Sequence, residues 1–145
     1  MAPVNRIDVR LYTASESPAG VGGWVYVNVG GREFSLDTTR NDFEPGDDFT
    51  YTFGENGNVN DAERNDPRSP QLDTDDLDRY PVYLRYAPPS NKPDEIWCLE
   101  RVIVTVNPGT ETPARFDNLR LAGTAANQKI WLGQRYGQVV NLRRI

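Results

Sequence analysis

A hairpin pattern between residues 24 and 37 constrains the fold of this chain more than any other feature. Apolar and polar residues alternate over 24–29 and again over 32–37, and a period of two is typical of a strand with one buried face. Gly30 and Gly31 separate the two runs, and a Gly-Gly loop favours a tight turn between antiparallel strands. The chain is therefore expected to be built from antiparallel strands.

Further short runs of the same kind occupy most of the chain, and their ends carry turn residues. We expect strands at residues 7–12, 48–53, 80–86, 96–106, 114–121, 129–132 and 136–142. The run 96–106 is the most apolar and predicts a central strand, interrupted by a bulge or an edge at Glu100 and Arg101. Seven to nine short strands without a convincing helix predict one all-β domain over residues 1–145, an antiparallel β-sandwich or barrel.

The stretch from Asn41 to Phe53 leads into one of these strands. Pro45 and Gly46 suit consecutive positions of a tight turn, and aromatic residues then alternate with threonines. Asp47 and Asp48 form a carboxylate pair, and two acids at the right separation are the minimum for glycosidase chemistry. Adjacent side chains on a turn or a strand diverge, so we interpret this pair as turn and strand-entry residues.

A long polar segment, residues 54–79, interrupts the strand pattern. Seven acids and two arginines between residues 61 and 78 give it a local net charge of −5, equal to that of the whole chain. Its runs 56–61 and 73–77 contain oxygen ligands of the kind that calcium binds, but neither has the EF-hand spacing. We interpret the segment as a solvated acidic loop, with a short helical turn at 73–77.

Composition excludes several classes of function. The chain contains no histidine, which removes Ser-His and Cys-His nucleophile systems and histidine-based zinc sites. Its single cysteine, Cys98, lies in an apolar run and is expected in the core. The net charge of −5 argues against a nucleic-acid partner. No signal peptide or transmembrane segment is evident, which favours a cytoplasmic location.

Exposed aromatic residues are the strongest candidates for ligand contact. Alternation puts Trp24 and Tyr26 on the outer face of their strand. Such side chains stack on sugar rings, and a tryptophan near a loop also suits a membrane interface. Trp97 and Trp131 are expected in the core.

Three pieces of the chain resemble the PLAT (lipoxygenase-homology) domain family. They are an opening strand, Gly-rich loop and second strand at 7–31 (IDVRLYTASESPAGVGGWVYVNVGG), a Phe-Glu-x-Gly turn at 42–53 (DFEPGDDFTYTF), and two strands around an Asn-containing loop at 82–106 (VYLRYAPPSNKPDEIWCLERVIVTV). The resemblance implies an eight-stranded antiparallel β-sandwich, here with the long acidic loop as an insertion. It also implies a domain without chemistry of its own that docks onto lipid surfaces or protein partners, often with calcium.

The same resemblance implies a contact surface at one end of the sandwich. Loops 15–23 and 88–95 would form it, with Val21 and Trp24 facing the membrane or partner beside Tyr26. The implied calcium ligands are Glu16, the Gly22 carbonyl, Asn91 and Asp94. Two departures from the family pattern bear on calcium: Gly22-Gly23-Trp24 replaces Gly-Thr-Asp, and the second ligand-bearing loop is reduced to Gly30-Gly31.

Three functional hypotheses follow from these observations. The first is a non-catalytic module that binds a membrane lipid surface or a protein partner, with or without calcium. The alternative is a lectin-like carbohydrate-binding module that uses Trp24 and Tyr26. An enzyme based on carboxylates ranks last, because the chain has no histidine.

Overall fold

A computed structural model describes residues 1–121 and 128–145 of the chain, and all the strands found there are antiparallel. The strands are β1 (Arg6–Thr13), β2 (Trp24–Val29), β3 (Arg32–Ser35), β4 (Asp48–Gly54), β5 (Val82–Ala87), β6 (Trp97–Val106), β7 (Ala114–Asp117), β8 (Ile130–Leu132) and β9 (Val139–Arg144). The helices of the described residues are two short 3₁₀ turns, η1 (Thr74–Asp78) and η2 (Leu119–Leu121). No helix in these ranges is long and apolar enough to cross a membrane.

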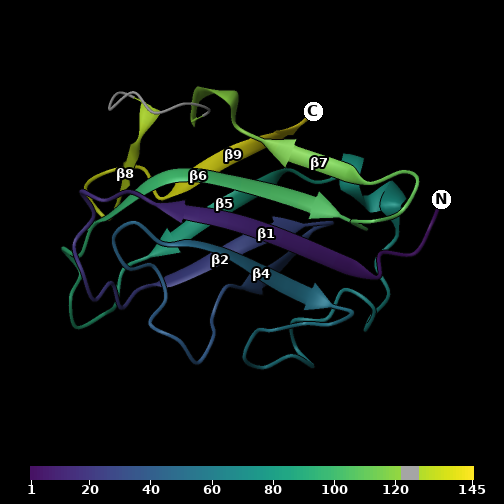
Figure 1. The fold of residues 1–145 in the computed structure, drawn as a ribbon, viewed down its shortest axis with the longest axis horizontal. Coiled ribbons are helices and arrows are strands. Elements are labelled where there is room, and N and C mark those ends of the chain that lie inside the picture. The colour runs from purple at the N-terminus through teal and green to yellow at the C-terminus, as the bar shows by residue number, and fades with distance from the viewer. Residues whose placement is uncertain (122–127) are drawn as a thin grey trace.

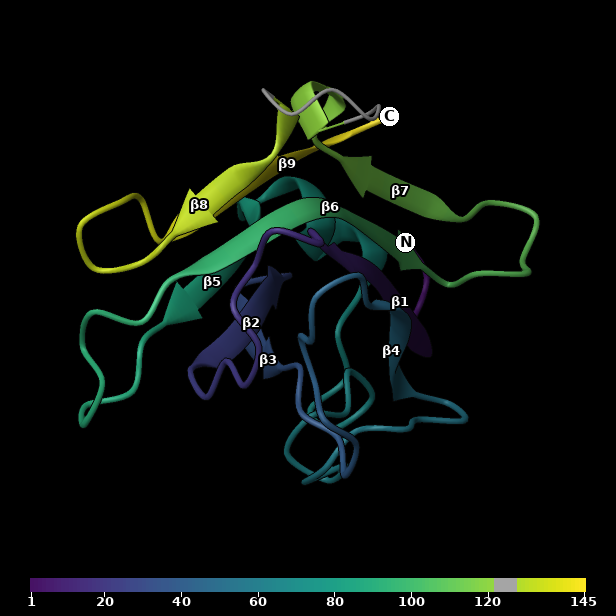
Figure 2. The ribbon, with the colours of Figure 1, turned by 60° about the vertical axis from the view of Figure 1, so that its left-hand side comes forward.

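The nine strands form one nearly closed sheet. Its order is β3-β2-β5-β9-β7-β6-β1-β4, and the short strand β8 pairs with β6 beside this path. Strand β9 connects the two halves, because Val140 pairs with Leu84 of β5 and Arg144 pairs with Phe116 of β7. The sheet curves into an arch that is open between β3 and β4 (Figures 1 and 2). The all-β antiparallel prediction is confirmed. Each of the nine segments expected to be strands contains one, β8 included, whereas the PLAT resemblance implied eight strands.

The core lies inside the arch and follows the predicted alternation. In β1 the buried residues are Ile7, Val9 and Leu11, and in β2 the three valines are buried. The register between β1 and β6 shifts at Glu100, because Tyr12 pairs with Arg101 whereas Thr13 pairs with Leu99. The predicted interruption of β6 is therefore a β-bulge.

Aromatic side chains fill one end of this core. The Trp97 ring lies 5.4 Å from that of Phe43 and 5.8 Å from that of Tyr86, measured between centroids. Its indole N–H donates to the Thr13 hydroxyl at 3.1 Å, so the buried polar atom has a partner. Trp97 is a core residue, as predicted. Trp131 is not, because 37% of its side chain is exposed on β8.

The acidic segment 54–79 lies across the opening of the arch. Most of its acidic side chains face solvent, as predicted, but three of its apolar side chains join the core. These are Val59, Leu72 and Leu77. The interpretation of the whole segment as a solvated loop is therefore wrong, because burial of these side chains ties its backbone to the sheet.

Side-chain amides of this segment pair with the two free edges of the sheet. The Asn58 amide accepts from the Thr52 N–H and donates to the Thr50 carbonyl of β4, both at 2.9 Å. On β3, the Ser35 N–H donates to the Asn65 side-chain oxygen at 2.9 Å. Unpaired backbone groups at a sheet edge are sites for aggregation. The loop therefore protects both edges.

The predicted helical turn of this loop is η1. Asp73 caps it by accepting from the Asp75 N–H at 3.0 Å, and Asp76 accepts from the Asp73 N–H at 3.1 Å in return. This reciprocal capping box satisfies backbone donors at the start of the turn. Two acids of the 73–77 run thus have a structural role.

We expect the Asn65→Ala variant to lose about 1–3 kcal/mol of its free energy of unfolding, because it removes the hydrogen-bond partner of the part-buried Ser35 N–H of β3 and of the Asn60 carbonyl of the loop. Asn65 is buried, and its amide also donates to the Asn60 and Asp61 carbonyls at 3.2 and 3.1 Å. Urea unfolding measures the change. Asn91→Ala, at an exposed asparagine, is the control and should stay within about 0.5 kcal/mol of wild type. Equal stability of both variants would contradict the edge-capping role.

Candidate functional site

Four loops meet at one end of the sheet, which we call the loop end: residues 14–23, 36–47, 88–96 and 133–138. Three of them lie together at the left of Figure 1, after β1, β5 and β8. The Gly20 N–H donates to the Glu44 carboxylate at 3.1 Å, which joins the first two loops. The Tyr86 N–H donates to the Gln138 carbonyl at 2.8 Å, which attaches the last loop to β5.

Glu95 anchors the Gly-rich loop. One of its carboxylate oxygens accepts from the Gly22 N–H at 2.9 Å, the Gly23 N–H at 2.8 Å and the Tyr86 hydroxyl at 2.7 Å. Burial raises the pKa of the Tyr86 phenol, and its hydrogen bond to the Glu95 carboxylate raises that pKa further. A Cβ at Gly23 would strike the Tyr86 ring and lie 2.7 Å from the Ala87 carbonyl oxygen. Only glycine allows this approach of the loop to β5.

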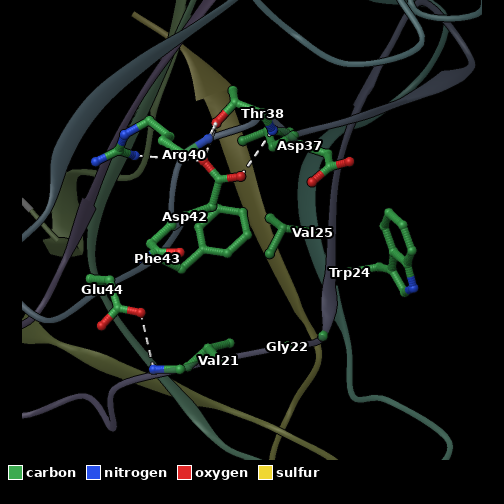
Figure 3. A pocket seen from close by; sticks show the side chains of 14 residues that line it. Val21, Gly22, Trp24, Val25, Asp37, Thr38, Arg40, Asp42, Phe43 and Glu44 are labelled. Carbon is green, nitrogen blue, oxygen red and sulfur yellow. Dashed lines mark hydrogen bonds and ion pairs between the residues drawn. The ribbon is translucent and has the colours of Figure 1, made fainter.

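A hollow of about 270 Å³, which we call the acidic hollow, opens between the loops 20–24 and 37–44. Figure 3 shows Val21, Val25 and Phe43 turned toward one another in it, while Trp24 points away from them. Phe43 has φ 63°, a left-handed conformation that is an outlier for a bulky residue. Its ring is nonetheless held in the core against Tyr51 and Trp97.

The carboxylates around this hollow are occupied as hydrogen-bond acceptors. Asp42 accepts from the Thr38 N–H at 2.9 Å, the Thr38 hydroxyl at 2.7 Å and the Tyr51 hydroxyl at 2.9 Å. Burial raises the pKa of the Tyr51 phenol, and the Asp42 charge adds to the effect. Asp37 accepts from the Asn60 side-chain amide at 3.1 Å. These acids stabilise the loop geometry.

The adjacent acids Asp47 and Asp48 diverge, as the interpretation of them as turn and strand-entry residues predicted. Asp47 lies 3.2 Å from the Arg40 guanidinium. Asp48 forms two hydrogen bonds with Arg10 of β1, at 2.9 and 3.0 Å. The two carboxylates thus bind different arginines.

Trp24 is the most exposed of the three predicted contact residues, with 52% of its side chain accessible. Tyr26 is half-buried, and the Arg85 guanidinium lies 4.3 Å from its ring centre. Val21 is only 9% exposed and lines the acidic hollow, so its side chain faces inward. Trp24 and Tyr26 thus lie together on the outer face of β2. Trp24 is the first residue of this strand and borders the loop end.

A second hollow, of about 380 Å³, lies on this outer face. We call it the aromatic groove, and its lining residues are Trp24, Tyr26, Glu33, Ser35, Asp61, Arg64 and Asn65. Trp24 lines both the groove and the acidic hollow. The polar residues of the groove could not be recognised from the sequence, because no local pattern marks residues 61–65 as neighbours of β2.

The four predicted calcium ligands do not form one cluster of side chains. Glu16 is paired with Lys129 at 2.6 Å, and this ammonium is the main cause that lowers the pKa of the Glu16 carboxyl. The Gly22 N–H is bound by Glu95, and Asn91 and Asp94 share a shallow hollow beside the 88–96 loop. In the described ranges, no three acidic, cysteine or histidine side chains are grouped to hold a metal. Calcium binding through Glu16, Gly22, Asn91 and Asp94 stays a prediction.

No protein-family model matches this chain, and no curated protein is significantly similar to it. The resemblance to PLAT domains therefore stays a prediction.

We expect Gly23→Ala to cost about 1–3 kcal/mol of the free energy of unfolding, because the added Cβ forces the Gly-rich loop away from Tyr86. Gly137→Ala is the matched control, since a Cβ there has no heavy atom within 4 Å. That change should leave stability unchanged or raise it by up to about 1 kcal/mol. Thermal and urea unfolding compare the two, and a neutral Gly23→Ala variant would contradict the close approach.

We expect stability to fall at alkaline pH because of Tyr51 and Tyr86. Both phenols have raised pKa values in the folded state, so the unfolded chain releases protons first as the pH rises above about 10. Above about pH 10, each of the two tyrosines lowers the free energy of unfolding by up to about 1.4 kcal/mol per pH unit. Below that pH neither tyrosine makes stability depend on pH. Urea unfolding between about pH 9 and pH 11 tests this. Tyr86→Phe should flatten the pH dependence, whereas Tyr136→Phe, at an exposed tyrosine, should not.

Proposed function

We propose that this chain is a non-catalytic binding module that docks on a membrane lipid surface through the loop end. The observation that carries the proposal is a pair of half-exposed aromatic side chains beside these loops. Trp24 is 52% exposed at the start of β2, and Tyr136 is 53% exposed in the loop 133–138. Aromatic rings with a polar edge are enriched at the boundary between headgroups and hydrocarbon.

The rigidity of the loop end supports docking without a large rearrangement. Glu95 joins the Gly-rich loop, by two hydrogen bonds, to Tyr86 of β5, by a third, and Glu44 attaches that loop to the 36–47 loop. A surface that is already ordered loses little conformational entropy on binding. The backbone of Trp24 is also fixed, because the next residue of β2, Val25, is buried in the core.

The charge of the loop end predicts which membranes it binds. Its acids outnumber its basic residues by seven to three, and the acids are Glu16, Asp37, Asp42, Glu44, Asp47, Asp94 and Glu95. This negative charge repels anionic headgroups. The module should therefore prefer zwitterionic vesicles when calcium is absent, and added calcium should raise its affinity for anionic vesicles by bridging the two surfaces.

We expect Trp24→Ala and Tyr136→Ala each to weaken partitioning into phosphatidylcholine vesicles roughly five- to tenfold, the effect of losing about 1 kcal/mol of apolar burial. Co-sedimentation with calcium and with a chelator measures this. Tyr80→Ala is the control, because Tyr80 is 48% exposed but lies beside Gly31, in the turn after β2. Absence of binding to zwitterionic and to anionic vesicles under both conditions would overturn the lipid proposal and leave a protein partner as the target of this end.

A further inference from the structure

The aromatic groove carries a second inference, which is independent of the loop end except for the shared residue Trp24. One wall of the groove comes from β2 and β3, through Trp24, Tyr26 and Ser35, and the other comes from the loop residues 61–65. Its volume of about 380 Å³ falls in the range of small-molecule sites, roughly 300–1,000 Å³. The groove is therefore large enough for a compact ligand.

The strand wall of the groove is held by an ordered set of side chains. The Arg85 guanidinium donates to both Glu33 carboxylate oxygens, at 2.8 and 2.9 Å, and the Tyr83 hydroxyl donates to one of them at 2.8 Å. Arg85 also covers one face of the Tyr26 ring. Glu33 and Arg85 neutralise each other, so this wall offers a fixed polar surface without net charge.

The loop wall is equally fixed but presents two charged groups that are not engaged. Asn65 is buried and holds the Asn60 and Asp61 carbonyls, while Asp61 has φ 52°. The Asp61 carbonyl also accepts from the Arg64 N–H at 3.0 Å. Within the described part of the chain, however, the Asp61 carboxylate and the Arg64 guanidinium make no hydrogen bond or ion pair. Asp61 and Arg64 both line the groove with Trp24, so this wall carries one acceptor group and one donor group.

This combination selects one class of ligand. A flat exposed indole binds the C–H face of a ring, and a neighbouring carboxylate and guanidinium bind hydroxyl groups, which both donate and accept. The opposite charges of Asp61 and Arg64 cancel, as do those of Glu33 and Arg85, so the groove as a whole favours a neutral ligand. A sugar acid would meet the Glu33 and Asp61 carboxylates, and an apolar ligand would cover the Asp61 carboxylate and the Arg64 guanidinium without giving them hydrogen-bond partners.

We propose that the aromatic groove binds a neutral pyranose unit of a glycan. The C–H face of the sugar stacks on the Trp24 indole, and its hydroxyls donate to the Asp61 carboxylate and accept from the Arg64 guanidinium. The Ser35 hydroxyl lies on the strand side of the same groove and contacts the sugar edge. Hexopyranosides fit this description, whereas sialylated or sulfated glycans are disfavoured.

Screening the full chain on an array of neutral and acidic glycans, followed by calorimetry with the best neutral oligosaccharide, tests this assignment. We expect Trp24→Ala to weaken binding at least tenfold, and Asp61→Asn and Arg64→Gln to weaken it roughly three- to tenfold each. Asparagine tolerates the left-handed conformation at position 61, so Asp61→Asn should keep the wild-type melting temperature. Tyr80→Ala is the control and should bind as the wild type does.

The outcomes of this test are separable from those of the membrane proposal. Asp61→Asn should lose glycan affinity and keep vesicle binding, whereas Tyr136→Ala should do the opposite. Absence of any neutral glycan bound at millimolar concentration would overturn the sugar site and leave the vesicle result unaffected. Full affinity in the folded Trp24→Ala variant, or tighter binding of acidic than of neutral glycans, would overturn it as well.

Discussion

Two unpaired sheet edges set the main physical requirement of this fold. Strand β9 pairs with both β5 and β7 and so makes one sheet from two halves, but β3 and β4 do not meet. The unpaired backbone N–H and C=O groups at such edges need hydrogen-bond partners, and pairing with a strand of another chain leads to aggregation. The segment 54–79 meets this requirement with the amides of Asn58 and Asn65. The core, the arch and the groove all depend on this closure.

Carboxylates in this protein act mainly as fixed acceptors for loops. Glu95 binds two successive backbone N–H groups and a phenol, and Asp42 binds a backbone N–H and two hydroxyls. An ionised carboxylate forms stronger hydrogen bonds than a neutral acceptor, so a few such residues order long connections. Burial raises the pKa values of the Tyr51 and Tyr86 phenols, and the neighbouring carboxylates raise them further, which links the stability of the domain to alkaline pH.

Trp24 connects the two proposed binding surfaces. It lies where the Gly-rich loop enters β2, and it borders both the acidic hollow and the aromatic groove. The loop end adds Tyr136 and a negative charge, which suits an interfacial contact with neutral lipid. The groove adds Asp61 and Arg64, which suit hydroxyl groups. Rigid surroundings are common to both, since binding to an ordered surface costs less conformational entropy.

The sequence by itself determined which side chains point inward and outward along each strand. Alternation is a local property of the extended backbone, so it predicted the buried valines of β2 and the outward Trp24. The charged pair Glu100-Arg101 predicted an interruption of β6, a bulge or an edge, and the structure has the bulge. Only the tertiary structure decided which segments lie side by side. Asn65 next to β3 and Glu95 next to Gly23 are contacts between distant positions, and a polar residue in a loop has the same local pattern whether it faces solvent or caps an edge. For that reason the segment 54–79 resembled a solvated loop in sequence, although it closes the sheet and lines the groove.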